Sequence, residues 1–402
     1  MRLGIDRLAT DPTLRARLRG KRIGLVCHPA SVTSDQRHTL DVFDALDDLE
    51  LAAIWGPQHG FMGDKQDNMV ETDHATDPSR GVPIFSLYGE VRRPTPEMMA
   101  HVDVVLFDLQ DVGTRIYTFL TTLLYMLEAC AEHGKTLWVL DRPNPAGRPV
   151  EGTLLRPGFE SFVGAGPLAM RHGLTLGEAA HWFVAHFGLK VDYDVIEMEG
   201  YDPTAAPGFG WPTGVLPWVN PSPNAPGLNM VRAYPGTVVL EGCTLSEGRG
   251  TTVPLEVMGA PDLHLTAIRA TMAELAPEWL QGAWVRSVFF EPTFHKHVGH
   301  TCRGIQVHTD FPGYQHTVFQ PYRLVSLFLK ATRLVHPTYD LWRDFPYEYT
   351  SGALPVDYID GGPLLREWVD DPSATVADRE AVMRADEATW TAQRQPFLRY
   401  PA

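Results

Sequence analysis

Short continuous runs of apolar residues alternate along this chain with stretches whose apolar positions recur at helical spacing. VVLFD (104–108) and TLWVLD (136–141) are rich in valine, leucine and aromatic residues, as is typical of strands buried on both faces of a parallel sheet. Between them, residues 116–133 keep helical spacing, and Gly134 follows where glycine commonly ends a helix. The pattern predicts a strand, a helix and a parallel strand.

The same alternation extends over the first half of the chain. Earlier strands are predicted in the runs KRIGLV, LELAAIWG and PIFSLY, and earlier helices over residues 3–19 and 38–48. Thr175 and Glu178 form a capping-box pattern that begins a helix ending before Gly188. This order predicts an α/β fold with a Rossmann-like, doubly wound parallel sheet.

A second, smaller unit is predicted from Pro254 onward. Helical patterns occur near residues 264–275 and 321–332 and again after Val376. We therefore expect residues 1–253 to form the Rossmann-like domain with most active-site loops, and residues 254–402 to form an α+β domain that closes the cleft. The region from Tyr201 to Pro235 is dense in proline, glycine and tryptophan and is predicted to be a long ordered loop, a feature that is usually functional.

Composition excludes several classes of function. The 402 residues carry a formal net charge of −15, which argues against nucleic acid or an anionic membrane as a partner. Apolar runs are too short to span a bilayer, and the polar N-terminus lacks the apolar core of a signal peptide, so a cytoplasmic location is expected. The four cysteines are scattered and form no CxxC pair, which argues against a disulfide framework or a cysteine-rich zinc site.

Cofactor motifs are missing at the positions where they would be expected. The first predicted strand runs into CHPASV rather than a glycine-rich turn, and the chain has no P-loop, so neither a dinucleotide nor a nucleotide is expected. His295, His297 and His300 raise the alternative of a metal-dependent hydrolase. Because a lysine interrupts these histidines and no carboxylate motif completes them, we expect no metal.

Polar residues collect where the predicted strands end. In open α/β sheets this carboxyl edge binds ligands. DLQDVGTRIY and DRPNPAGRPVEG place there Asp108, Asp111, Arg115, Tyr117, Asp141, Asn144 and Glu151. The loop after the second strand adds Gln58, His59, Asp64, Lys65, Gln66, Asp67, Asn68 and Glu71. Such a set suits a polyhydroxylated ligand, although a solvated loop and helix capping are the alternatives.

Carboxylate chemistry is the reaction type that remains. The chain shows no GxSxG elbow or cysteine-centred nucleophile motif. EGCTLSEGRGTT (241–252) offers Glu241, Glu247 and Arg249 among glycines and hydroxyls, with an Arg–Glu structural pair as the alternative interpretation. A glycoside hydrolase needs two carboxyl groups, one protonated and one acting as base or nucleophile, and nearby tryptophans could stack on sugar faces.

Several motifs, taken together, are similar to those of a known family: GPQHGFMGD, DLQDVGTRIYTF, DRPNPAGRPVEG, LPWVNPSPNAP, EGCTLSEGRGTT, FEPTFHKHVGHTCRGIQVH and FPYEY. In this order, over about residues 20–365, they resemble the exo-β-N-acetylmuramidase (NamZ-type) family. The resemblance implies a cleft between a Rossmann-like and a smaller domain. It also implies release of N-acetylmuramic acid from the non-reducing end of peptidoglycan fragments without metal or nucleotide.

One position departs from the family pattern. Family members commonly show Glu-His-Gly where this chain has Gln58-His59-Gly60, and glutamine cannot donate an acid proton. We therefore expect Glu151 or Glu247 to be the general acid and Glu71 or Asp108 its partner. The substrate-binding residues are expected to be Gln58, His59, Asp111, Arg115, Tyr117, Asp141, Asn144, Asn224 and Arg249, with Arg115 on the lactyl carboxylate. A sugar-binding protein without turnover, or a glycosidase of a related amino sugar, is the alternative.

Overall fold

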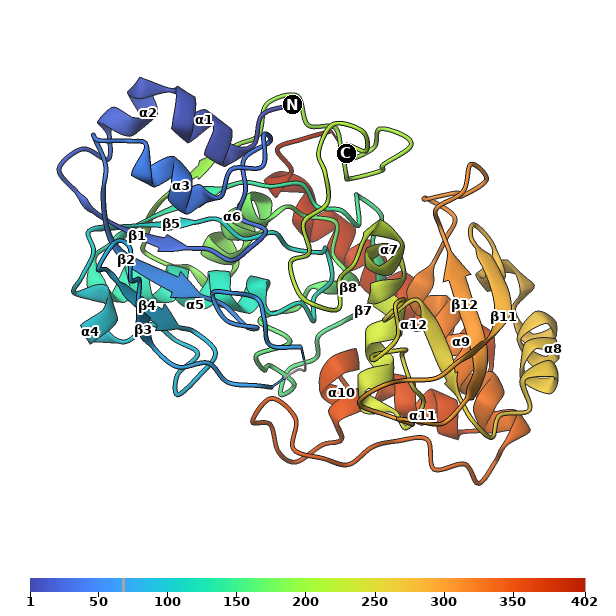
Figure 1. The fold of residues 1–402 in the computed structure, drawn as a ribbon. Coiled ribbons are helices and arrows are strands. Elements are labelled where there is room, and N and C mark those ends of the chain that lie inside the picture. The colour runs from blue at the N-terminus through green and yellow to red at the C-terminus, as the bar shows by residue number, and fades with distance from the viewer. Residues whose placement is uncertain (67–68, 402) are drawn as a thin grey trace.

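The computed structural model describes residues 1–66 and 69–401, which form two lobes side by side (Figure 1). Within the described residues, the N-terminal lobe contains a seven-stranded sheet. Its strands, in spatial order, are β3 (Ala75–Thr76), β4 (Pro83–Ser86), β2 (Glu50–Gly56), β1 (Arg22–Val26), β5 (Val104–Phe107), β6 (Thr136–Leu140) and β9 (Asp192–Ile196). β3 pairs with β4 antiparallel, and the other neighbours are parallel.

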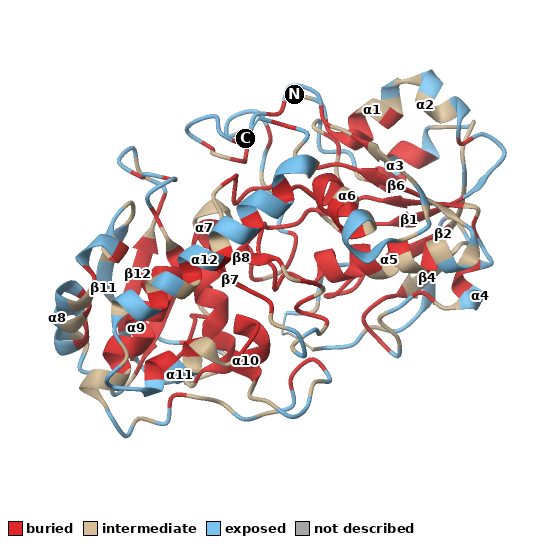
Figure 2. Ribbon diagram, turned by 180° about the vertical axis from the view of Figure 1, so that it is seen from behind, coloured by how far each residue is buried: buried red, intermediate tan, exposed pale blue. Residues whose placement is uncertain are grey.

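Helices cover both faces of this sheet, as Figure 2 shows from behind. They are α1 (Gly4–Thr10), α2 (Pro12–Ala16), α3 (Thr39–Asp44), α4 (Pro96–Met99), α5 (Phe119–His133) and α6 (Leu176–Phe187). On β5, Val104 and Leu106 point into a core shared with α1 and α3, whereas Val105 and Phe107 point into the core shared with α5 and α6, because successive side chains of a strand alternate between faces. The predicted doubly wound sheet is confirmed.

The helix boundaries follow from local residues. α5 ends at Gly134, which adopts φ 60°, and α6 begins with the predicted capping box of Thr175 and Glu178. The single opening helix predicted over residues 3–19 is wrong. Asp11 interrupts it with an extended backbone and accepts a hydrogen bond from the Thr13 N–H, so that a second helix starts with Pro12 in its first turn.

The C-terminal lobe packs helices against an antiparallel sheet with the order β10-β12-β11, which confirms the smaller α+β part of the predicted fold. Its strands are β10 (Val257–Ala260), β11 (Trp284–Phe290) and β12 (Cys302–His308). Its helices are α7 (Leu228–Thr237), η1 (Val238–Gly242), α8 (Leu265–Leu275), η2 (Pro277–Leu280), α9 (Pro321–Val335), α10 (Pro355–Asp360), α11 (Leu364–Asp370), α12 (Val376–Arg394) and η3 (Gln395–Phe397).

Helix α7 begins inside the region predicted to be a loop. Pro235 and Gly236 lie in its last turns, and both residues disfavour a helix interior. A Cβ on Gly236 would meet the carbonyl oxygen of Pro321 at 2.0 Å, so glycine allows α7 to cross α9 closely. Packing of this kind stabilises a helix whose local propensity is poor.

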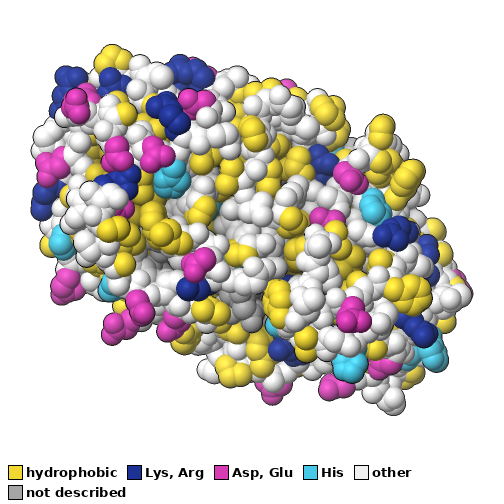
Figure 3. All heavy atoms as spheres, viewed as in Figure 1, with side chains coloured by type: hydrophobic (Ala, Val, Ile, Leu, Met, Phe, Trp, Pro, Cys, Tyr) yellow, Lys and Arg dark blue, Asp and Glu magenta, His cyan; other side chains and the backbone are white. Residues whose placement is uncertain are grey.

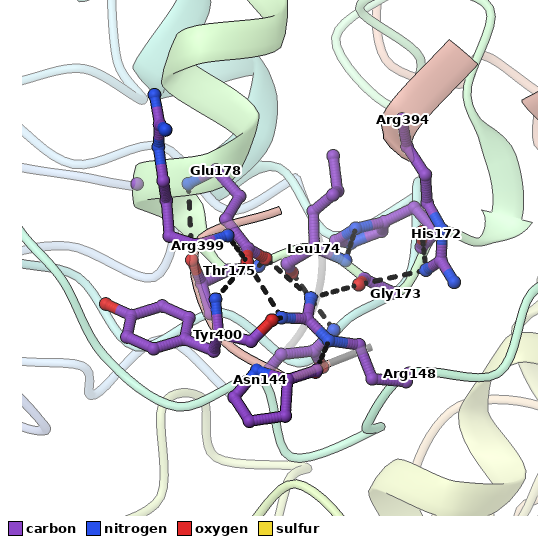
Figure 4. A network of polar contacts seen from close by, with 12 residues as sticks. Asn144, Arg148, His172, Gly173, Leu174, Thr175, Glu178, Arg394, Arg399 and Tyr400 are labelled. Carbon is purple, nitrogen blue, oxygen red and sulfur yellow. Dashed lines mark hydrogen bonds and ion pairs between the residues drawn. The ribbon is translucent and has the colours of Figure 1, made fainter. Parts of the chain in front are cut away.

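The end of the chain returns to the N-terminal lobe. The indole N–H of Trp390, on α12, donates to the carbonyl of His172 (2.8 Å), and Tyr400 donates to Asp141 (2.7 Å). Figure 4 shows Arg148 between the carboxylate of Glu178 (2.7 and 2.8 Å) and the carbonyl of Tyr400 (3.0 Å). The two lobes are therefore tied together. The domain boundary between residues 253 and 254 stays a prediction.

The lobes are also joined by a short antiparallel pair, β7 (Glu151–Leu154) and β8 (Ala169–Arg171). Helix α12 packs against β7, and β7 also contacts α9. None of the helices in the described part of the chain is long and apolar enough to cross a membrane.

Candidate active site

A cavity lies where loops from both lobes meet. Chain order in the large sheet reverses between β1 and β5, and open α/β sheets bind ligands beyond the carboxyl ends of the strands near such a reversal. The loops that follow β2 and β5 provide part of the lining. The lining residues are Gln58, His59, Ile116, Tyr117, Thr118, Val163, Ser222, Asn224, Met230, Tyr234, Glu241, Arg249, Leu255, Tyr347 and Glu348.

Glu348 is a buried carboxyl group in this cavity. Its Oε1 accepts hydrogen bonds from the Tyr88 hydroxyl (2.8 Å) and from Nε2 of Gln58 (3.4 Å). Burial raises the pKa of Glu348 to about 7, although the Tyr88 hydroxyl and the Arg92 guanidinium act in the opposite direction. Glu348 is therefore able to hold a proton near neutral pH and to release it to a bound molecule.

Gln58 is held in one orientation. Thr118 donates its hydroxyl to Oε1 of Gln58 (2.7 Å), which directs the amide N–H of Gln58 toward Glu348. His59, the next residue, has a backbone φ of 70°, and Glu348 has a φ of 43°. Both residues adopt the left-handed region, which is unfavourable for side chains other than glycine and is concentrated at functional sites.

A chain of alternating charges begins at the cavity, where Glu241 and Arg249 belong to the lining. Arg249 contacts Glu241 at 2.5 Å and Glu247 at 3.2 Å, and Lys296 contacts Glu247 at 2.6 Å. Burial alone would raise the pKa of Glu247, but Lys296 and Arg249 lower it to about 2. The Tyr347 hydroxyl lies 3.4 Å from the second oxygen of Glu241. Glu241 thus presents a carboxylate to the cavity with a fixed cation beside it.

The remaining lining combines aromatic rings with neutral polar groups. Tyr117 and Tyr234 meet edge to face, with ring centroids 6.2 Å apart. Asn224 is fixed by its bonds to the backbone oxygen of Gln66 (2.7 Å) and to the side-chain nitrogen of Gln66 (3.2 Å). Concave sites of this composition suit a small polar molecule with several hydroxyl or amide groups. Together with two carboxyl groups, the composition matches the requirements of glycoside hydrolysis.

Comparison with known proteins decides the family. Models of the N-terminal and C-terminal parts of the exo-beta-N-acetylmuramidase NamZ match residues 23–229 and 232–400. The chain belongs to the NamZ family. It is 36% identical over 401 residues to the peptidoglycan beta-N-acetylmuramidase NamZ of Bacillus subtilis (strain 168), and the match covers 99% of this chain and 91% of that protein.

Two solved structures share the fold of this chain. A DUF1343 family protein of Bacteroides fragilis NCTC 9343 superposes with a TM-score of 0.86 at 26% identity, covering 100% of this chain and 99% of the other. A second DUF1343 protein of the same organism shares the fold, with a TM-score of 0.73 at 24% identity over 99% and 98% of the two chains. The resemblance of the motifs to the NamZ family is therefore confirmed.

The structure brings part of the predicted NamZ site together. The predicted residues that line the cavity are Gln58, His59, Tyr117, Asn224 and Arg249. Glu247 lies immediately behind Arg249 and does not line the cavity. Asp67 and Asn68, which belong to the predicted polar cluster, lie outside the described residues.

Three other predicted catalytic carboxylates do not line the cavity. Glu151 is buried at the start of β7, where it accepts the backbone N–H of Arg323 at 2.9 Å. Asp108 forms a buried bidentate pair with Arg142, at 2.6 and 2.9 Å. Glu71 is half exposed, and a hydrogen bond from the Tyr349 hydroxyl lowers its pKa.

The other predicted binding residues tie loops together. Arg115 donates to the carbonyls of Thr153 (2.7 Å), Leu168 (2.9 Å), Ile359 (3.1 Å) and Asp360 (2.6 Å). Asp111 accepts the N–H of Gly113 at 2.6 Å, Asp141 accepts the N–H of Gly177 at 2.9 Å, and Asn144 donates to Leu174 at 3.0 Å. These side chains make contacts within the protein and do not line the cavity.

Sequence reasoning missed Glu348 and Tyr347. Both belong to FPYEY, one of the motifs that carried the resemblance, but no strand or helix pattern places that motif near the sheet edge. Glu241 belongs to the motif EGCTLSEGRGTT but is not among the residues predicted to be catalytic or substrate-binding. Among the side chains of residues 1–66 and 69–401, including the histidines that suggested a metal, no group of three or more His, Cys, Asp or Glu has the arrangement of a metal site.

Proposed function

We propose that this protein removes N-acetylmuramic acid from the non-reducing end of peptidoglycan fragments, with Glu348 as the general acid. The observation that carries the proposal is the buried Glu348 carboxyl, with its pKa near 7, in one cavity with the Arg249-bound Glu241. The activity named for the Bacillus subtilis relative, 36% identical over almost the whole chain, supports the same substrate class.

Glu348 donates a proton to the glycosidic oxygen as the bond to the anomeric carbon breaks. Protonation of the leaving oxygen by a positioned carboxylic acid is the usual way to assist this step. Tyr88 and Gln58 both donate to Oε1 of Glu348, so they hold the carboxyl group in place and also stabilise the carboxylate that remains after proton transfer.

Glu241 is the second carboxylate of the proposed mechanism. It faces the positive charge that develops on the sugar, and it acts either on a water molecule or on the anomeric carbon itself. Arg249 and Tyr347 contact the two oxygens of Glu241 and fix its direction. Protein carboxyl groups supply the whole reaction in this scheme, and we propose that it needs no metal.

Gln58 positions the acid in this proposal. A glutamine at this position cannot supply a proton, but its amide links Thr118 to Glu348. The acid function that the family resemblance attributes to a glutamate at position 58 is thus carried by a neighbouring side chain from the other lobe. Sugar hydroxyl and acetamido groups bind to His59, Ser222 and Asn224, which line the same cavity.

Hydrolysis of a chromogenic β-N-acetylmuraminide tests the function. The matching β-N-acetylglucosaminide is the control for sugar identity, and each assay is repeated with EDTA. Release of the chromophore from the muraminide alone, unchanged by EDTA, is the expected result. A protein that binds N-acetylmuramic acid in a thermal-shift assay but releases no chromophore would instead be a sugar-binding protein, and loss of activity with EDTA would contradict the metal-free scheme.

A further inference from the structure

A second, larger cavity lies beside the candidate active site. It is an open groove and is larger than the pocket. Residues of β10, β11 and β12 line it together with the loops around Gly250 and Thr293. The proposed reaction at the terminal sugar takes place in the pocket and does not involve this groove.

The groove and the pocket share a wall. Gln66 lines the groove, and its side chain and backbone oxygen both contact Asn224, which lines the pocket. Gly250 lines the groove and directly follows Arg249 of the pocket. A molecule that extends out of the pocket past Asn224 and Arg249 therefore meets the groove.

The shared wall is held firmly at Gly250. The backbone N–H and the hydroxyl of Thr293 both donate to the carbonyl of Gly250, at 3.0 and 2.8 Å. A Cβ at Gly250 would lie 2.7 Å from the backbone nitrogen of Phe294, and Gly250 has φ 83°. Only glycine fits this close approach, so the loop that separates pocket and groove has little freedom to close over the groove.

The floor of the groove is one face of the small sheet. Alternate residues of β11 share a face, and Arg286, Val288 and Phe290 line the groove in this way. The opposite face is turned toward α8, where Arg269 donates to the Ser287 hydroxyl at 2.7 Å. Figure 3 shows hydrophobic side chains interspersed with charged ones on the face of this lobe that is turned to the viewer.

The groove combines aromatic and hydrogen-bonding groups. Phe290, on the groove face of β11, and Phe294 are partly exposed and line it. Arg286 is held in place by Gln306 (2.5 Å) and by His308 (3.0 Å), and Thr251 and Glu291 add further polar groups. Sugars offer an apolar ring face and a rim of hydroxyl and amide groups, so an amino-sugar chain fits this mixture, whereas a purely apolar partner would leave the polar groups unpaired.

We infer that the groove binds the part of the glycan that extends beyond the terminal sugar, so that the enzyme prefers oligosaccharides to small glycosides. The inference rests on the proposed function, because an exo-acting enzyme encloses one terminal sugar and must leave the rest of the chain outside its pocket. Arg286 suits the carboxylate groups that muramic acid residues carry along such a chain. The occupant is thus a β-linked chain of N-acetylated amino sugars.

A double variant, Arg286→Ala with Phe290→Ala, tests the groove. Arg286 is exposed, and Phe290 is partly exposed and belongs to neither core cluster, so the fold should remain. The matched control is Arg269→Ala with Phe187→Ala, which removes the same kinds of side chain from exposed positions outside the groove. We expect the groove variant to lose about tenfold in kcat/KM on a hexasaccharide of alternating N-acetylmuramic acid and N-acetylglucosamine, mainly through KM, and to stay within about twofold on the chromogenic muraminide.

The outcomes separate the groove from the function. Suppose that the wild-type protein hydrolyses the muraminide. The inference is then overturned if the groove variant loses kcat/KM equally on both substrates, or on neither of them. Wild-type protein that hydrolyses nothing would overturn the proposed function. The groove is then tested by calorimetric binding of the pentasaccharide that begins with N-acetylglucosamine. Weaker binding by the groove variant than by the control supports the inference, and equal or absent binding rejects it.

Discussion

The side-chain amide of Gln58 lies 3.4 Å from the carboxylate of Glu348, a residue 290 positions further along the chain. Gln58 follows β2 of the N-terminal lobe, whereas Glu348 lies on the loop between α9 and α10 of the other lobe. The proposed acid is thus carried by one lobe and oriented by the other, and its proton affinity depends on the contact between them.

Removing the acid should abolish turnover but not binding. We expect Glu348→Gln to lower kcat on an activated muraminide by at least about 100-fold, because the neutral amide cannot protonate the leaving oxygen, while N-acetylmuramic acid still raises the Tm. Steady-state kinetics and thermal shift measure the two effects. A variant that keeps more than a tenth of wild-type kcat would remove Glu348 from this role.

The pH dependence should report the environment of Glu348. With a pKa of about 7, the acid is protonated below that value, and kcat should fall as pH rises through about 7. Gln58→Glu places a second carboxyl group beside Glu348, and like charges disfavour ionisation, so the alkaline limb should move up by about one pH unit. Gln58→Met, which removes the amide without adding charge, is the control. Identical alkaline limbs for both variants would argue against the pairing.

Substitutions of Glu71 and Arg92 should differ in their effects on kcat and on its pH dependence. Arg92 lies between the rings of Tyr88 and Tyr349, at 4.4 and 4.1 Å, and contacts Glu71 at 3.4 Å. Because the positive charge of Arg92 lowers the pKa of Glu348, Arg92→Gln should shift the alkaline limb upward. Glu71→Gln should leave kcat within about threefold, as expected for an exposed ion pair. A loss of 100-fold in Glu71→Gln would restore the catalytic role first expected for this residue.

Replacing Arg115 should lower the stability of the protein and should not change its preference between the muraminide and the glucosaminide. Its guanidinium is buried and donates to four backbone carbonyls of three segments. Arg115→Met would remove this donor from all four carbonyls, of which Asp360 keeps the Thr153 hydroxyl as a donor, at a cost on the order of 3 kcal/mol in the free energy of unfolding. Denaturant unfolding measures this loss, with the exposed Arg269→Met as control. A selective loss of muraminide over glucosaminide activity, with stability unchanged, would contradict this assignment.

Glu151 should make stability depend on pH. Burial raises its pKa from 4.5 to about 7, even though Arg323 opposes the shift. The folded state therefore binds this proton more tightly than the unfolded state. The stability that it contributes is complete below about pH 4.5 and is lost as pH rises through about 7. Glu151→Gln, which stays neutral, should flatten this decline in a series of denaturant titrations, whereas parallel curves for the two proteins would refute the assignment.

The strands of the large sheet could be predicted because each is marked by residues that are adjacent in the sequence. Continuous apolar runs identified β1, β2, β4, β5 and β6, and capping residues identified α6. Helix α7 could not be predicted, because Pro235 and Gly236 disfavour a helix and only the packing on α9 favours one. The cytoplasmic location expected from the sequence stays a prediction.

The site was harder to predict than the fold, for a physical reason. Polar residues at a strand edge can bind a ligand or hold loops, and sequence spacing does not distinguish the two uses. Asp108 and Asp141 are at the expected edge, but their carboxylate oxygens accept hydrogen bonds from Arg142 and from the N-terminus of α6. Glu348 lies on an irregular loop between helices, and its three-dimensional contacts with Gln58 and Tyr88 associate it with the site.

The return of the chain end to the first lobe has a consequence for how the molecule folds. The carbonyl of His172 accepts bonds from Trp390 and Arg394, and Glu178 accepts the backbone N–H of Arg399. A chain broken near residue 230, between the regions matched by the two family models, would have donors on one fragment and acceptors on the other. We therefore expect the two lobes to unfold together in one cooperative transition, and neither fragment to fold stably without the other.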